Sequence, residues 1–463
     1  MTYCFDVDKF KATFNISESK TKPTHFTGKC FRVFPYKAKD KDSQVTSVHE
    51  LIGRYFCQIQ ECQETTITFD ELKNKVVEKV RINPELKTEF EKVLKDLFFD
   101  DEKLKPTNLN LMYLQECPKD QKDVADYLSD ALGRREQIKA ILDECSQRMK
   151  TQANVLESLV ISLFDPKFAD DVKHKPPYFQ VVTLFNELFE SDLKFILESA
   201  TRTRESLVDL LHLYYFTYTA QTCLQLNRFM HGNRKQCVPI YFALEWEKTS
   251  QGRKCCDEGW KQLHPGIEAI FTHAFVLELL NQTKATHNYD YIGLAEFIEA
   301  NPNSESEIAE QIRLMADTYR NSIDDCPKMT ELSRPDSELM SPEREIEFLF
   351  KSVDYQFKYT SRKKPQSNYV SGFIEFCKEQ FVQPRGSNGS MLILSESNLI
   401  LLTKLAIKKA EKLRLNEVFK EFEKRGFYFD AKSKTCVMEY FEKLNLIEKK
   451  SDSGDAQYVK RIL

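Results

Sequence analysis

The sequence predicts a mainly α-helical protein: a multi-helix body, a small mixed N-terminal region before it, and a C-terminal winged helix-turn-helix. Composition is one reason, because Leu, Phe, Lys and Glu dominate while only 13 Gly and 16 Pro occur among 463 residues. Periodicity is another, since apolar residues recur at helical spacing through most of residues 123–350. The third reason is the C-terminal stretch, where three helical patterns precede a predicted hairpin.

Residues 1–115 are predicted as a mixed, α-rich region. Residues 29–36 alternate polar and apolar side chains as a strand does, whereas residues 70–99 predict helices broken at Pro84. The strand candidate carries basic and aromatic residues of the kind that single-stranded nucleic-acid binders use. A half-buried strand whose basic side chains extend to solvent explains them equally well. They are Lys29, Phe31, Arg32, Phe34, Tyr36 and Lys37.

Residues 116–382 are predicted as a helical body. Four segments repeat their apolar residues at helical spacing. They are residues 124–151, 155–163, 180–200 and 206–226. Residues 210–227 lack Asp, Glu, Lys and Arg, but their His, Tyr, Thr and Gln side chains predict a buried helix rather than a membrane span, which needs a more uniformly apolar segment.

The helical pattern of the body is interrupted in its middle and at its end. Residues 238–245 predict a buried strand or an extended segment. Residues 245–253, which include Trp246, fit either a surface loop with one anchoring Trp or a docking edge for another subunit. After a helix predicted at 369–381, residues 383–390 contain Pro and Gly in a composition typical of a hinge.

Residues 391–463 are predicted as the winged helix-turn-helix, beginning with two helices. The first is predicted at 397–409, where Leu and Ala residues share one face. The second is predicted at 417–425, with Asn416 as its N-cap and Gly426 as its C-terminal stop.

The third helix and a hairpin complete this predicted module. A helix at 431–445 occupies the position of a recognition helix and places its apolar residues on one face. Two short runs, 446–450 and 457–463, flank the turn-rich residues 451–456 and predict a β-hairpin. This hairpin is the predicted wing.

The charge of the C-terminal stretch favours nucleic-acid contact. From Met391 onward there are 15 Lys and Arg against 11 Asp and Glu, a balance of +4, so the rest of this −4 chain carries −8. Neutralising phosphates supplies most of the affinity for DNA. We expect double-stranded DNA to be contacted by the first turn of the third helix and by residues beside the wing. The candidate residues are Lys432, Lys434, Thr435, Lys449, Lys450, Lys460 and Arg461. Alternatively, the module docks protein, which winged helices also do.

Three segments of the chain resemble a known family. They are LNLIEKKSDSGDAQYVKRIL at the C-terminus, EFEKRGFYFDAKSK before it, and PIYFALEWEKTSQGRKCCDEGW in the body. In these residues the chain is similar to the G subunit of DNA phosphorothioation-dependent restriction systems, the family called DptG or DndG. The resemblance implies a bacterial, cytoplasmic defence protein that acts with two partner subunits, which carry ATPase and DNA-cleaving functions. Such a complex attacks DNA that lacks the sulfur modification of its backbone.

The sequence predicts a non-catalytic subunit rather than an enzyme. It contains no G-x-x-x-x-G-K followed by Ser or Thr, no G-x-G-x-x-G, no G-x-S-x-G and no H-E-x-x-H. We therefore expect no catalytic residue and no cofactor. The alternative to a DNA-binding adaptor is a structural scaffold subunit whose winged helix docks protein.

Cysteine usage predicts a reducing compartment and no metal site. The 13 Cys form no C-x-x-C pair, which favours free thiols in a cytoplasm. One local concentration of potential zinc ligands exists, but its irregular spacing argues against structural zinc. It comprises His231, Cys237, Cys255, Cys256 and His264. Residues 1–10 lack the basic start and apolar core of a signal peptide.

Overall fold

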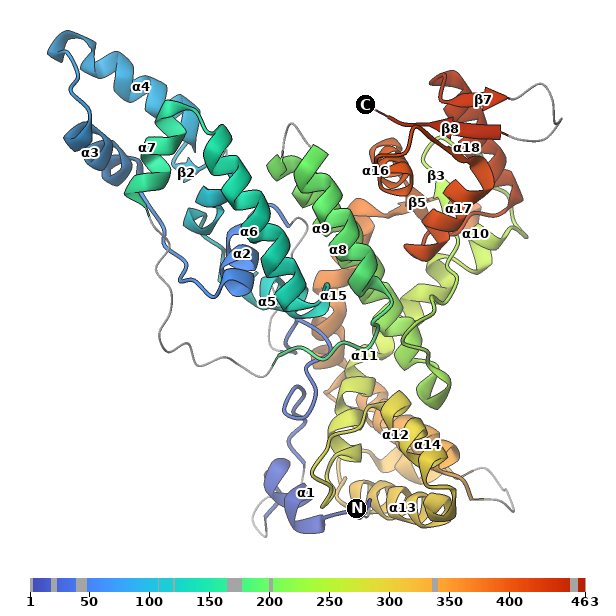
Figure 1. Ribbon diagram of the computed structural model, residues 1–463. Coiled ribbons are helices and arrows are strands. Elements are labelled where there is room, and N and C mark those ends of the chain that lie inside the picture. The colour runs from blue at the N-terminus through green and yellow to red at the C-terminus, as the bar shows by residue number, and fades with distance from the viewer. Residues whose placement is uncertain are drawn as a thin grey trace.

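The computed structural model describes residues 3–17, 23–38, 48–106, 108–119, 121–164, 177–199, 203–334, 340–449 and 457–462. These residues form eighteen α-helices and eight short strands, so the predicted mainly α class is confirmed. Figure 1 shows an N-terminal arm at the upper left, a lower lobe around α12 to α14, and the C-terminal elements at the upper right, all meeting at a central group of helices.

The N-terminal arm contains six helices and one small hairpin. Its elements are α2 Ile52–Gln60, α3 Phe69–Lys79, η1 Pro84–Leu86, α4 Lys87–Phe98, β1 Phe99–Asp100, β2 Lys103–Leu104, η2 Leu109–Leu114, α5 Lys122–Ala131, α6 Arg135–Gln152 and α7 Val155–Leu163. The predicted break at Pro84 is confirmed, because Pro84 opens η1 after the Asn83 cap. The segment predicted at 124–151 is divided into two helices by Gly133, whose φ of +77° ends α5.

The centre and lower lobe are built from long, buried helices. Their elements are α1 Val7–Thr13, α8 Phe185–Ser199, α9 Thr203–Leu226, η3 Phe229–His231, α10 Lys254–Asp257, α11 Trp260–Leu280, α12 Tyr291–Ala300, η4 Pro302–Ser304, α13 Glu305–Asn321, η5 Pro327–Glu331, α14 Pro342–Tyr359 and α15 Lys363–Gln380. As predicted, α9 is a buried helix; its Gln221 side chain donates to the Val238 carbonyl at 2.8 Å. In the described part of the chain, no helix combines the length and apolar composition needed to cross a bilayer.

The strand predicted at 29–36 is wrong. This segment makes one isolated bridge, from Arg32 to Tyr178. Phe31, Val33, Phe34 and Tyr36 are all buried, so side chains on both sides of the segment pack into the core. Within the described residues its pairing is limited to this one bridge, so the segment belongs to none of the named strands.

The hinge predicted at 383–390 is also wrong. These residues form most of a β-hairpin: β4 Val382–Pro384, η6 Gly386–Asn388 and β5 Ser390–Leu394. Strand β5 pairs in parallel with β3 Ala243–Leu244, so the sheet order is β3-β5-β4. The glycines that suggested a linker supply positive φ for the tight turn, +56° at Gly386 and +74° at Gly389.

The C-terminal module, residues 396–462, follows this sheet. Its elements are α16 Glu396–Ile407, β6 Lys412–Arg414, α17 Leu415–Lys424, α18 Ala431–Lys443, β7 Ile447–Lys449 and β8 Gln457–Lys460. The three strands form an antiparallel sheet in the order β6-β8-β7. The helices and the two hairpin strands lie close to their predicted ranges. The predicted N-cap Asn416 is wrong: Arg414 takes the N-cap position, because α17 starts as soon as Arg414 leaves its pairing with Tyr458.

The module packs directly on the central helices. Phe427 stacks against Phe242 with ring centroids 4.9 Å apart. Gly426, with φ of +86°, lies against α9, where a Cβ would approach Thr217 Cγ2 to 2.8 Å. The position therefore requires glycine both for its backbone conformation and for this close contact. Figure 1 shows the same arrangement, with the red module beside the green helices.

Candidate nucleic-acid interface

Helix α18 presents the first two candidate residues. Asp430 caps the helix by accepting from the Ser433 backbone N–H at 3.0 Å. Lys432 and Thr435, in the first turns, are exposed, and Lys432 forms no ion pair within the described residues. Three residues apart on a helix, they lie on one face.

Lys434 lies on a different face from Lys432. Residues two apart on a helix point in nearly opposite directions. The Lys434 Nζ lies 3.1 Å from Glu423 Oε1 and 5.1 Å from the centroid of the Phe419 ring, so it is directed at α17. The structure thus separates Lys434 from the other two candidates of this helix.

The candidates around the hairpin do not come together either. Lys449 is paired with Glu442 of α18 at 2.9 Å. Lys450 lies outside the described residues. Lys460 pairs with Lys412 across the sheet, at the end of β8 remote from the 450–456 connection, and Arg461 follows it. Lys460 and Arg461 therefore lie away from Lys449, because β8 runs away from the hairpin connection before reaching them.

The start of α18 is held by the body through the Arg253 cluster, which comprises Glu247, Arg253, Asp430 and Ser433. Arg253 donates to Asp430 from Nε at 3.0 Å and from Nη2 at 2.5 Å. Its Nη1 lies 2.5 Å from Glu247 Oε1, and the Ser433 hydroxyl lies 2.9 Å from Glu247 Oε2. Residues 245–253 therefore contact the chain's own C-terminal module, and two of their charged side chains, Glu247 and Arg253, are buried rather than solvated.

The Arg253 cluster predicts that the stability of the folded protein depends on pH in the acid range. Burial acts to raise the pKa of Asp430, but hydrogen bonds from Arg253 and from the Ser433 N–H outweigh it and lower the pKa from 3.8 to about 2. A carboxyl whose folded-state pKa is depressed stabilises the folded protein above its unfolded pKa. We expect this contribution to be lost as the pH falls from about 4 to about 2.

Asp430→Asn tests this dependence, because Asn retains the capping oxygen but has no charge to titrate. Chemical unfolding of both proteins at neutral pH and through the acid range gives the measurement. We expect the variant to be less stable at neutral pH and to lose less stability between pH 4 and 2. Equal acid losses in the two proteins would contradict the assignment.

A second buried group joins the module to the body. The Arg425 cluster comprises Asp192, Tyr214, Lys408 and Arg425. Arg425 donates to both carboxylate oxygens of Asp192, each at 2.7 Å, and Tyr214 donates to Asp192 at 2.7 Å. The exposed fractions of the Arg425 and Asp192 side chains are 1% and 0%. Burial and then the charge of Asp192 raise the pKa of Tyr214 well above 10, which keeps the phenol a donor.

Sequence reasoning missed both clusters. Asp192 and Arg425 are 233 positions apart, and Arg253 and Asp430 are 177 apart. The single available signal was a charged residue next to the predicted helix stop at Gly426. A charge at a helix end is ordinarily solvated, so nothing in the local pattern indicates a distant partner.

The basic and aromatic set at 29–37 serves packing. Its aromatic residues are buried, as described above. The guanidinium of Arg32 lies 3.8 Å from the centroid of the Tyr178 ring, and Lys37 pairs with Asp123. These contacts agree with the interpretation in which the set supports the core, and they leave no exposed aromatic face for bases to stack on.

The possible zinc ligands are scattered. His231 pairs with Glu343 at 2.6 Å, His264 stacks on Trp260, and Cys255 is buried. No three His, Cys, Asp or Glu side chains converge on a metal-sized site anywhere in the described part of the chain.

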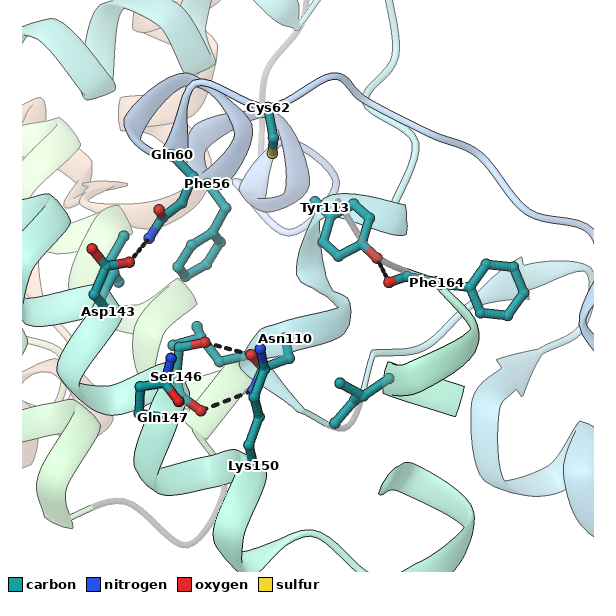
Figure 2. A pocket seen from close by; sticks show the side chains of 13 residues that line it. Phe56, Gln60, Cys62, Asn110, Tyr113, Asp143, Ser146, Gln147, Lys150 and Phe164 are labelled. Atoms are coloured by element: carbon teal, nitrogen blue, oxygen red, sulfur yellow. Dashed lines mark hydrogen bonds between the residues drawn. The ribbon is translucent and has the colours of Figure 1, made fainter. Parts of the chain in front are cut away.

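A cavity of about 230 Å³ lies in the N-terminal arm between α2, η2, α6 and α7. Figure 2 shows that its polar side chains face one another: Gln60 donates to Asp143 at 3.1 Å, and Asn110 bonds with Ser146. Phe56 and Tyr113 form part of its apolar wall.

Neither a scan against protein-family models nor a search of curated proteins found any match to this chain.

Proposed function

We propose that this chain is a non-catalytic, DNA-contacting adaptor subunit of a bacterial, cytoplasmic restriction complex that acts on DNA lacking phosphorothioate modification. The observation that carries the DNA part is the order of elements from α16 to β8: helix, strand, two helices, then two paired strands. This is the order of a winged helix-turn-helix, in which α18 is the recognition helix. Its exposed Lys432 and Thr435 are suited to phosphate and base contact.

The assignment to a restriction complex rests on the family resemblance of residues 239–260, 421–434 and 444–463. It makes ATPase and nuclease subunits the expected partners and leaves cleavage to them. Co-expression with such subunits, followed by purification through a tag on this chain, tests this part. Failure of both subunits to co-purify would argue against it.

The surface of α18 favours a second candidate, in which the module docks protein. Glu439 and Glu442 are exposed on the same helix as Lys432, so its charge is nearly balanced. Trp246, 40% exposed, stacks on Tyr440 at 4.8 Å and extends this surface with an aromatic ring. Exposed Trp and Tyr with balanced charge are typical of protein interfaces.

Replacing both exposed candidates of α18 separates the two functions. We expect the full-length double variant Lys432→Gln, Thr435→Ala to bind unmodified duplex DNA more weakly than the natural chain. The slope of log K against log salt should fall by about 1, because one phosphate contact is lost. Fluorescence anisotropy at several salt concentrations gives both values. The intact chain is required, because Arg425 and Asp430 of the module pair with the body.

Lys92→Gln, which removes an exposed lysine of α4, is the matched control and should leave binding unchanged. If the natural chain does not bind duplex DNA, or the double variant binds equally well, the DNA contact of α18 is excluded. Loss of co-purification with the partner subunits in the double variant, without any change in DNA binding, would instead establish the docking function.

A further inference from the structure

The three-stranded sheet of the module has two chemically different faces. Leu413, Ile447 and Val459 are aligned across the strands and face the core; Val459 is fully buried. Side chains alternate along each strand, so the residues between them face outward. The outward residues are Lys412 and Arg414 of β6, Tyr458 and Lys460 of β8, and Glu448 of β7.

This outer face places two lysines directly opposite each other. Lys412 and Lys460 are register partners in neighbouring antiparallel strands. Like charges in this position destabilise a sheet. Lys412 turns across the Tyr458 ring, 5.5 Å from its centroid, to reach Glu448 at 2.6 Å. Glu448 is thereby neutralised, and Lys460 has no ion pair within the described residues.

One arginine lies on this face, and a second lies at its edge. Arg414 is exposed, and its Nε lies 3.4 Å from the Tyr458 hydroxyl. Arg461, the residue after β8, is exposed and is held by its backbone N–H, which donates to the Glu411 carbonyl at 3.0 Å. Neither arginine forms an ion pair within the described residues. With Lys460 they make three exposed cations beside two exposed acids, Glu411 and Glu417, the second of which acts on Arg414.

We propose that this outer face and its edge, with the exposed cations Arg414, Lys460 and Arg461, bind the phosphodiester backbone of duplex DNA. Neighbouring strands are about 4.8 Å apart, and alternate residues of one strand are about 7 Å apart. Cations at this spacing suit a duplex that carries one negative charge per roughly 1.7 Å of axis. A polyanion also supplies counter-charge to Lys460, which has no ion pair within the described residues.

This inference rests on the proposed function and assigns it a second contact surface besides α18. The test compares the full-length natural chain with the triple variant Arg414→Gln, Lys460→Gln, Arg461→Gln, using an unmodified duplex of about 30 base pairs, roughly three helical turns. We expect the salt slope of binding to fall by about 3 and the affinity to fall about tenfold or more. The matched control, Arg81→Gln, Lys87→Gln, Lys92→Gln, removes three exposed cations from the N-terminal arm and should bind as the natural chain does.

The variant Lys460→Glu distinguishes a lost DNA contact from misfolding. Opposite charges across the strands should raise the midpoint of thermal unfolding, while the lost cation weakens DNA binding. If the natural chain binds DNA and the triple variant binds with the same salt slope, this inference is overturned and the contact by α18 stands. If the salt slope of binding falls in the α18 double variant but not in the triple variant, this inference is likewise overturned and the contact by α18 stands. Absence of DNA binding by the natural chain overturns both proposals.

Discussion

Arg425→Met is expected to lower the free energy of unfolding by about 3 to 5 kcal/mol, the cost typical of removing one partner of a buried ion pair. The reason is that Asp192 remains buried after its guanidinium partner is removed. Asp192 is fully buried, and without Arg425 it keeps the Tyr214 hydroxyl and Lys408 but loses two hydrogen bonds of 2.7 Å. Met fills a similar volume, so the cost reports mainly the lost charge and hydrogen bonds of the guanidinium at a buried carboxylate. Urea unfolding at neutral pH gives the measurement.

The matched control is Lys424→Met, one residue earlier. Lys424 is exposed and pairs with Glu421 at 2.6 Å, so its loss should cost less than about 1 kcal/mol. A second variant, Asp192→Leu combined with Arg425→Met, removes both charges and should recover part of the stability. Equal stability of the Arg425 and Lys424 variants would show that the buried pair contributes nothing.

Arg253→Ala is expected to cost about 3 kcal/mol and to loosen the start of α18. Glu247 and Asp430 would both lose their guanidinium partner, and the side chain of Glu247 is only 2% exposed. The cap of α18 depends on Asp430 being held in place, so amide hydrogen exchange should rise in the first turns of α18. Urea unfolding and exchange measured by mass spectrometry together test both effects.

Lys254→Ala is the control for Arg253→Ala. Lys254 is the next residue, is exposed, and contacts the Tyr241 ring rather than α18. Arg253→Lys should recover only part of the stability, because one ammonium does not reproduce a planar guanidinium that reaches Asp430, Ser433 and Glu247 together. Unchanged exchange in α18 of the Arg253→Ala protein would contradict the role of this cluster.

The two clusters change how the C-terminal module is expected to act. A module joined by a hinge would reorient when it meets DNA. In this chain, β5 pairs with β3, and Arg253 and Arg425 join the module to the body at two places. The module and residues 245–253 are therefore held in one arrangement relative to each other, and a partner that contacts both would meet them in that arrangement. The proposed partner contact at Trp246 and the proposed DNA contact at the outer sheet face use different residues, so the two proposals are compatible in this arrangement.

The sequence by itself determined the local elements. The apolar period and the stops at Pro84 and Gly426 located helices, and the runs at 446–450 and 457–463 located paired strands. The prediction from sequence failed where one local pattern is compatible with two different structures. Alternation at 29–36 predicts a strand, and the glycines at 386 and 389 predict a hinge, but the structure has neither. Their outcomes depend on what packs beside them, which a short window of sequence does not contain.

Only the tertiary structure decided which charges are available to a partner. Lys434 and Lys449 looked equivalent to Lys432 and Lys460 in the sequence, yet Glu423 and Glu442 neutralise the first two. The sequence does not indicate Arg414 as a DNA-contact candidate, because its place on the same sheet face as Lys460 depends on the register of β6 and β8. Local period sets which face of an element a side chain occupies. The neighbour it meets there depends on contacts between residues far apart in the chain, because those contacts fix how the elements pack.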